Sequence, residues 1–234
     1  NRPVKTAFAI AAHPDDIDFG TAGTMAALTA AGTHVAYCLV TSGDAGDDDL
    51  TRSSEELARQ REAEQTEAGV MVGVEEIHWL HHPDGMVVPD LTLRRDIARI
   101  IRMVKPNVVV SQATEPNWDR IYGAHPDHLA TAQATMAAVY PDSRNPRAFP
   151  ELLDEGHQPH KVTEVWMTGQ NPNRFVDITD TFDQKVAALR AHASQTARID
   201  DLEKLLREWS GGTAATAGMD DGRLAEGFRV ISTA

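Results

Sequence analysis

The chain has 234 residues, is poor in cysteine and has no long apolar run. Its one cysteine, Cys38, cannot form an internal disulfide, and its apolar neighbours in residues 36–40 are typical of a buried strand. No stretch approaches the roughly 18 apolar residues of a membrane helix, and no signal peptide is visible. We therefore expect a protein without a membrane span that resides in the cytoplasm.

Basic residues are few, and several common motifs are absent. There are 22 Lys and Arg against 35 Asp and Glu, a formal net charge of −13. Nucleic acids and anionic membranes require a basic face, so neither is expected as a partner, and a solvated acidic surface accounts for the excess. The sequence lacks Gly-x-Gly-x-x-Gly after its first predicted strand, a Gly-Lys-Ser/Thr phosphate loop and a Gly-x-Ser-x-Gly elbow. Dinucleotide, nucleotide triphosphate and serine-hydrolase chemistry are therefore unsupported.

Short β-rich runs alternate with longer helical ones along the chain. This pattern predicts an α/β fold with a Rossmann-like, largely parallel sheet and helices on both faces. We expect a single domain, 1–234, with a core at about 1–140 and a small C-terminal lobe at about 141–234. The predicted strands are 4–12, 34–40, 76–80, 108–111, 162–168, 175–178 and 227–231; the predicted helices are 20–31, 53–72, 91–104, 125–140 and 181–209; residues 141–160 are predicted as a long loop.

Polar side chains gather directly after four of the predicted strands. In open parallel sheets, ligands bind beyond the carboxyl ends of the strands, where such segments meet. The four segments are residues 13–16, 42–49, 81–85 and 114–128. Their common position predicts one active site at the C-terminal ends of the strands.

Two of these segments carry side chains that bind metals. His13 and Asp16 are three residues apart on a turn, and His125 and His128 are three apart at a helix start, so each pair can face one ion. A His₂Asp set leaves an open position for water, and a spare carboxylate can take its proton. Alone, the first run could be a capped turn and the second a plain helix start; together they favour a metal site. Zn²⁺ is the default ion, and the ligands also suit Fe²⁺, Co²⁺ or Mn²⁺.

The constellation resembles the LmbE-like, or PIG-L, family of zinc-dependent N-acetylglucosaminyl deacetylases, which includes the mycothiol-pathway deacetylase and the mycothiol S-conjugate amidase. The resemblance covers the chain from Ala7 to about Thr196. Its marks are Ala-His-Pro-Asp-Asp at 12–16, Thr-Ser-Gly-Asp-Ala-Gly at 41–46, Arg61 with Glu64, Asp84 with Gly85, His-Pro-Asp-His at 125–128, and His-Ala-Ser-Gln at 192–195.

The resemblance implies roles for five of these residues. His13, Asp16 and His128 would be the zinc ligands. Asp15 would be the general base for the water that attacks the amide carbonyl. His125 would stabilise the oxyanion and help to protonate the leaving amine. The spacing alone does not show which of the two neighbouring carboxylates binds the metal.

Five further residues are candidates for substrate binding: Arg61, Asp84, Trp118, Tyr122 and His192. The resemblance suggests that Arg61 and Asp84 bind polar sugar groups, although Arg61 also fits a surface lattice of charges. Trp118 lies in a long loop and suits stacking on a sugar ring. Tyr122 lies one residue further from His125 than is common in the family, so it either reaches the oxyanion or packs on its loop. His192 would reach the site from the C-terminal lobe.

These features predict a zinc hydrolase that removes the acetyl group from an N-acetyl amino sugar or its glycoside. An amidase of a larger, mycothiol-type thiol-sugar conjugate uses the same chemistry and stays an alternative. A noncatalytic carbohydrate-binding protein is a third hypothesis, but it predicts the loss of Asp15 or of a metal ligand, and all are present. A small amino-sugar or glycoconjugate substrate is the expected partner, and formation of a homo-oligomer is left open.

Overall fold

The computed structural model describes residues 4–119, 121–169 and 171–233. Its strands form one sheet in the order β3-β2-β1-β4-β5-β7-β6, in which β1 to β5 run parallel and β7 is antiparallel to β5 and β6. The predicted α/β fold with a largely parallel sheet is confirmed. The strands are β1 (Thr6–Ala11), β2 (His34–Leu39), β3 (Glu76–Trp79), β4 (Val108–Ser111), β5 (Glu164–Met167), β6 (Arg174–Asp177) and β7 (Ala225–Ser232); the helices are α1 (Asp16–Ala30), α2 (Ser54–Met71), α3 (Leu91–Val104), α4 (Pro126–Ala137), α5 (Glu151–Asp154), α6 (Phe182–Ala191), α7 (Ala193–Thr196) and α8 (Leu202–Thr216).

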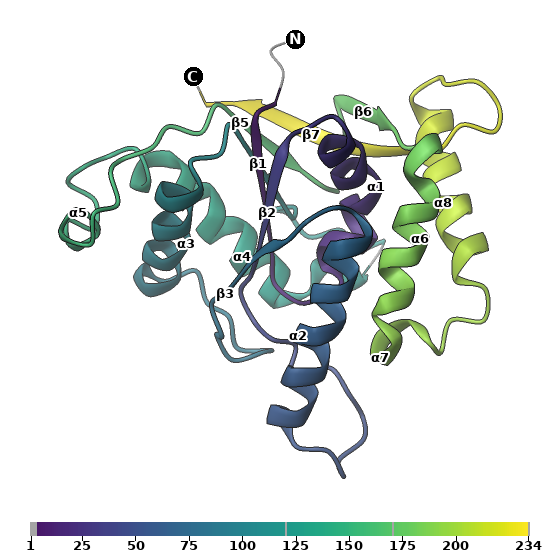
Figure 1. Ribbon diagram of the computed structural model, residues 1–234, viewed down its shortest axis with the longest axis horizontal. Coiled ribbons are helices and arrows are strands. Elements are labelled where there is room, and N and C mark those ends of the chain that lie inside the picture. Colours follow the sequence, from purple (N-terminus) through teal and green to yellow (C-terminus); the bar gives the residue numbers. More distant parts are fainter. Residues whose placement is uncertain (1–3, 120, 170, 234) are drawn as a thin grey trace.

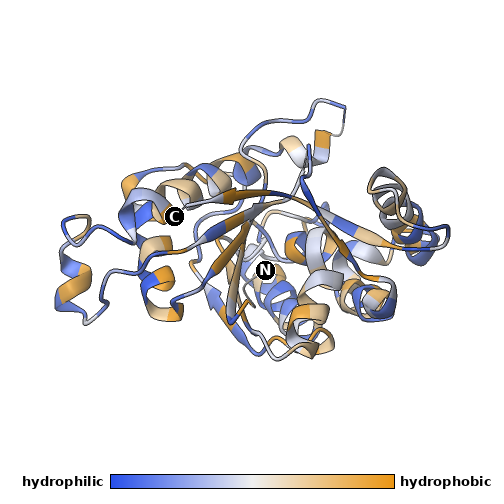
Figure 2. Ribbon diagram, turned by 90° about the horizontal axis from the view of Figure 1, so that it is seen from above, coloured by the Kyte–Doolittle hydropathy of each residue, from blue (hydrophilic) through white to orange (hydrophobic). Residues whose placement is uncertain are grey.

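Helices cover both faces of the sheet (Figure 1). Successive side chains of a strand point to opposite faces, and β1 shows the two cores that result. Phe8 and Ile10 pack in the apolar cluster beneath α3 and α4, whereas Ala7, Ala9 and Ala11 pack in the cluster beneath α1 and α2. Figure 2 shows the apolar strands between helices whose outer surfaces are largely hydrophilic. Burial on both faces makes the central strands nearly continuous apolar runs.

The C-terminal part of the chain continues the same sheet. Strands β5, β7 and β6 extend it beyond β4, and α6 packs against α1 and α2. A third apolar cluster, which includes Phe182, Leu189 and Leu206, joins α6 to α8. The division into a core and a C-terminal lobe stays a prediction. In the described part of the chain no helix is both long and apolar enough to cross a membrane.

Several element boundaries differ from the predicted ones. Helix α1 begins at Asp16 rather than at residue 20, which brings the polar turn after β1 directly onto a helix start. Helix α4 ends at Ala137, and a wider helical turn, Ala138–Asp142, follows it. The predicted loop 141–160 contains the short helix α5.

The single helix predicted for residues 181–209 is wrong, because this segment forms α6, α7 and the first half of α8. The side chain of Asp201 accepts a hydrogen bond from the N–H of Lys204 at 3.0 Å and so begins α8. Helix α8 then folds back on α6, which buries Leu206 against Leu189. Neither proline nor glycine marks the break in the sequence.

Candidate metal centre

The turn between β1 and α1 carries the first group of candidate ligands. Only residues 12–15 separate the strand from the helix, at the carboxyl end of a central strand. Asp16 is the first residue of α1, and its Oδ2 accepts a hydrogen bond from the N–H of His13 at 2.8 Å. The short turn and this bond hold both side chains on the same side of the turn.

The start of α4 carries the second group. His125 caps the helix, since its Nδ1 accepts a hydrogen bond from the N–H of Asp127 at 3.2 Å. Pro126 occupies the first helical position, where its missing N–H costs nothing. His128 follows three residues after His125, so both imidazoles lie on one side of the helix start.

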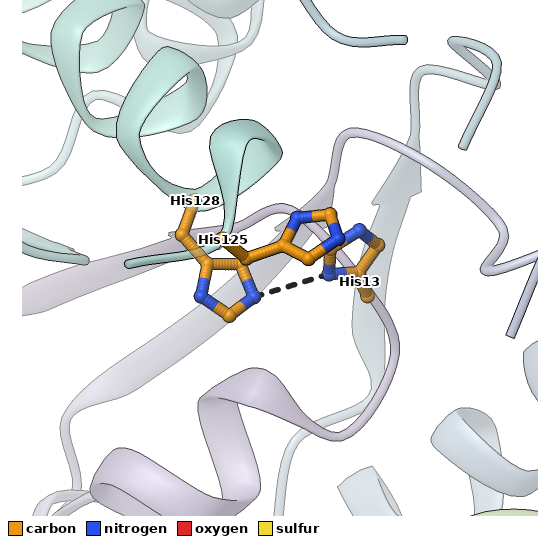
Figure 3. Close-up of side chains that lie close together, drawn as sticks. All are labelled: His13, His125 and His128. Atoms are coloured by element: carbon orange, nitrogen blue, oxygen red, sulfur yellow. Dashed lines mark hydrogen bonds between the residues drawn. The ribbon is translucent and has the colours of Figure 1, made fainter. Parts of the chain in front are cut away.

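Three donor groups, from His13, Asp16 and His128, converge between these elements, and Figure 3 shows the imidazoles of His13 and His128 close together. Nδ1 of His13 lies 3.2 Å from Nε2 of His128 and 3.2 Å from Oδ2 of Asp16, and Oδ1 of Asp16 lies 3.0 Å from Nε2 of His128. Donors at about 2.1 Å from a tetrahedral ion lie about 3.4 Å from one another. The three groups therefore fit one divalent ion after a shift of a few tenths of an ångström, and two imidazoles with a carboxylate suit a transition metal.

The other ring nitrogen of His13 faces two carboxylates. Nε2 lies 2.9 Å from Oδ1 of Asp84 and 3.3 Å from Oδ2 of Asp127. Asp127 is buried and also accepts hydrogen bonds from the N–H groups of Gly85 and Val87, at 2.7 and 3.2 Å. A carboxylate on the outer nitrogen of a histidine fixes the tautomer that leaves the inner nitrogen free for a metal.

These contacts add one residue to the predicted site and change the expectation for another. The sequence did not single out Asp127; its position between two histidines at a helix start was the available signal. Asp84 was predicted to bind sugar hydroxyls, but its carboxylate is occupied by His13 and by the N–H of Ala45, at 2.9 Å each, and its side chain is only 7% exposed. The geometry therefore favours Asp84 as a support for His13.

The electrostatics of His13 follow from these neighbours. Burial lowers the pKa of His13, but hydrogen bonds with Asp127, Asp16 and Asp84 outweigh it and raise the pKa to about 12. The pKa of Asp16 shifts in the opposite direction. Burial raises it, but the contact with His128 outweighs burial and holds the pKa of Asp16 well below its usual range. In the metal-free protein, the surrounding carboxylates thus favour the positively charged form of His13.

Asp15 lies beside the cluster, and its side chain does not cap helix α1. It precedes α1 with a left-handed backbone, φ 88°, and its carboxylate makes no capping hydrogen bond to the helix. The guanidinium of Arg61 lies 3.4 Å from this carboxylate. Burial and the adjacent Asp16 raise the pKa of Asp15 to about 7, against the opposing effect of Arg61. A carboxylate that titrates near neutrality suits a general base.

The ring of His125 completes the group. It stands edge-on to His13 with 5.0 Å between ring centroids, and its centroid lies 5.2 Å from that of His128. Burial, together with the positive charge of its two neighbours, lowers the pKa of His125. The structure thus brings together all five residues to which the family resemblance gave a role in metal binding or catalysis.

Arg61 and His192, both expected at the substrate, are buried instead. Arg61 is 4% exposed, and it donates hydrogen bonds to the carbonyls of Gly43 and Pro14 at 3.0 and 2.7 Å. His192 is fully buried, and its Nε2 lies 2.9 Å from the carboxylate of Asp18. In this structure His192 is out of reach of a substrate, because packing of α6 against α1 and α2 encloses it.

Trp118 and Tyr122 lie on the loop between β4 and α4. Their exposed fractions are 75% and 88%, and Tyr122 belongs to the helical turn Ile121–Ala124 directly before His125. Both are available to contact a substrate, which keeps their predicted role open.

The fold and the cluster together define a Rossmann-like protein with a candidate divalent-metal centre at the carboxyl ends of its strands. The model of the PIG-L family, described as GlcNAc-PI de-N-acetylase, matches residues 8–139, which include both histidine-containing runs. The chain therefore belongs to the PIG-L family, as its motifs predicted.

Individual relatives agree with this assignment. The chain is 33% identical over 230 residues to a diacetylchitobiose deacetylase of Thermococcus kodakarensis, a match that covers 97% of this chain and 84% of the relative. It is 32% identical to a 1D-myo-inositol 2-acetamido-2-deoxy-alpha-D-glucopyranoside deacetylase of Saccharopolyspora erythraea, covering 81% and 83%. The structure of N,N'-diacetylchitobiose deacetylase from Pyrococcus horikoshii superimposes with a TM-score of 0.88 at 31% identity, covering 98% of this chain and 84% of that one.

Proposed function

We propose that this chain is a metal-dependent amide hydrolase that removes the acetyl group from an N-acetyl amino sugar or its glycoside. The observation that carries the proposal is the convergence of His13, Asp16 and His128 on one point, with the carboxylate of Asp15 beside them. The names of the relatives support the reaction, since the two curated relatives described above are deacetylases of acetylated sugars.

Asp15 acts as the general base in this proposal. A divalent ion held by the three donors would lower the pKa of a water and polarise the acetamide carbonyl. Asp15 is placed to take a proton from the attacking water as the oxygen of the water bonds to the carbonyl carbon. In the metal-free protein, burial raises the pKa of Asp15 to about 7, whereas the pKa values of Asp16, Asp84 and Asp127 are lowered, so Asp15 is the most basic of these carboxylates. Arg61 opposes the shift and orients the carboxylate.

His125 acts on the other side of the reacting carbonyl. Because its Nδ1 accepts a hydrogen bond from the N–H of Asp127, the neutral ring carries its proton on Nε2. That N–H can stabilise the negative charge that develops on the carbonyl oxygen and then help to protonate the leaving nitrogen. The carbon–nitrogen bond breaks, and the water supplies the hydroxyl of acetic acid and the hydrogen of the free amine.

Metal content and acetate release from the purified protein test the proposal. We expect near-stoichiometric zinc, acetate release from N-acetylglucosamine or diacetylchitobiose, and loss of release with a chelator. Reloading with Zn²⁺, Fe²⁺, Co²⁺ or Mn²⁺ compares the candidate ions. Asp15→Asn should keep the metal and lose most turnover; undiminished turnover would remove Asp15 as the base.

The other outcomes separate the alternatives. Bound metal without acetate release, but with cleavage of a thiol-sugar conjugate, would favour the amidase. Sugar binding without cleavage of either substrate would favour a noncatalytic carbohydrate-binding protein. A protein that binds no transition metal under metal-replete conditions would refute the mechanism.

A further inference from the structure

A series of buried polar groups leads from the backbone of Asp15 into the interior. The N–H of Asp15 donates to Oε1 of Gln65 at 3.0 Å, and Nε2 of Gln65 donates to Oδ2 of Asp18 at 2.7 Å. The same oxygen of Asp18 lies 2.9 Å from Nε2 of His192. Gln65, Asp18 and His192 are each 0% exposed, so they act on the site only through Asp15 and its turn.

The backbone of Asp15 requires such support. Its φ of 88° lies in the left-handed region, which a residue with a side chain rarely adopts. Gln65 provides the acceptor for the N–H in this conformation. Arg61 lies one helical turn earlier on α2, donates to the carbonyl of Pro14 and faces the carboxylate of Asp15. Helix α2 therefore holds both the backbone and the side chain of this residue.

Asp18 decides which way the amide of Gln65 points. A carboxylate only accepts hydrogen bonds, so the nitrogen of the amide faces Asp18 and its oxygen faces Asp15. His192 donates to the same carboxylate and thereby fixes the acceptor that orients Gln65. Reversal of the amide would place two acceptors against each other on one side and two donors on the other, both buried.

We propose that Gln65, oriented by Asp18 and His192, is a positioning residue that keeps the carboxylate of Asp15 directed at the attacking water. This inference rests on the proposed function, in which Asp15 is the base. It also gives His192, which cannot touch the substrate, a defined part in the site.

Gln65→Met tests the proposal, because methionine has a similar length but makes neither hydrogen bond. We expect kcat to fall on the order of 10- to 100-fold, as displacements of about 1 Å do elsewhere, with KM and zinc content unchanged. Gln184→Met is the matched control, since Gln184 is exposed on α6, and should leave all three unchanged. In the Asp15→Asn background Gln65→Met should lower the residual rate no further, because both changes act through one group. Losses that multiply would overturn the proposal.

Hydrogen exchange of the Asp15 amide in the zinc-loaded protein provides a readout independent of turnover. Exchange should be faster in Gln65→Met than in the wild type, and unaltered in Gln184→Met. Unaltered exchange in Gln65→Met would refute the positioning role, whereas a wild-type protein that releases no acetate would refute the proposed function alone. If Gln65→Met does not fold, Asp18→Leu removes the acceptor that Gln65 and His192 share, keeps a side chain of similar shape, and should produce the same changes in exchange and kcat.

Discussion

The two carboxylates that face Nε2 of His13 should differ in what they contribute to stability. Asp84→Ala and Asp127→Ala each remove one acceptor from His13, so that loss is common to both variants. The remaining contacts differ. Asp127 accepts from the N–H of Val87 in a buried setting and from the N–H of Gly85 in a partly buried one. Asp84, whose own side chain is largely buried, accepts from the N–H of the exposed Ala45, where water can replace it.

The difference in free energy of unfolding follows from these partners. A buried N–H left without an acceptor costs about 1–3 kcal/mol, and the Gly85 amide adds less because water can partly reach it, so Asp127→Ala should cost about 2–4 kcal/mol. Loss of the exposed Ala45 bond should cost only about 0.5–1.5 kcal/mol. We therefore expect Asp127→Ala to be the more destabilising of the two by about 1–3 kcal/mol.

Urea unfolding in the presence of a chelator measures this difference without a contribution from metal binding. Asp154→Asn, on the exposed side of α5, is a control for the loss of a negative charge. Equal destabilisation by Asp84→Ala and Asp127→Ala would refute the reasoning, because it would mean that the loop amides do not depend on Asp127. A zinc titration of the folded Asp127→Asn and Asp84→Asn proteins should in addition show affinities about 10- to 100-fold lower, since both residues support a metal ligand.

Two further predictions follow from the pKa shifts in the metal-free protein. The pKa of Asp15 is raised from 3.8 to about 7, so its ionised form costs stability above pH 3.8. Asp15→Asn should therefore raise the melting temperature at pH 8 while abolishing turnover. A lower melting temperature would contradict this. The pKa of His13 is raised from 6.5 to about 12, so its stabilising contribution is complete below pH 6.5 and is lost as the pH rises through about 12. In chelator, the free energy of unfolding of the wild type should fall more steeply across this window than that of His13→Gln; parallel curves would refute the assignment.

The sequence predicted most of the sheet because its central strands are short apolar runs bounded by turn residues. Strand β2, for example, is buried from Val35 to Leu39 and was expected within one residue of its observed end. The prediction of a single helix for residues 181–209 failed for a physical reason. No proline or glycine interrupts this segment, and the break before Asp201 accompanies the packing of α8 on α6. That packing depends on distant parts of the chain, which a local pattern does not contain.

The candidate site likewise has one part that local sequence patterns predict and one part that they do not. The proposed ligands were predictable because two short runs carry them, three residues apart within each run. The supporting contacts were not, because they join residues far apart in the sequence: Gln65 and Asp15 are separated by 50 positions, and His192 and Asp18 by 174. Nothing local marks a glutamine on a helix as the partner of a backbone amide in another element.

Arg61 and His192 belong to the family motifs, but their burial shows that neither is placed to contact a substrate in this structure. Both residues hold other parts of the site and are closed off from solvent. The centre itself lies on the short turn between β1 and α1 and at the starts of α1 and α4, two helices that pack on the two cores of the sheet, whereas Trp118 and Tyr122 lie exposed on a loop. A rigid set of elements suits a reaction that demands fixed distances, and loops at its edge suit the selection of different acylated sugars. We therefore expect the choice of substrate to depend on the loops rather than on the residues that the motifs share.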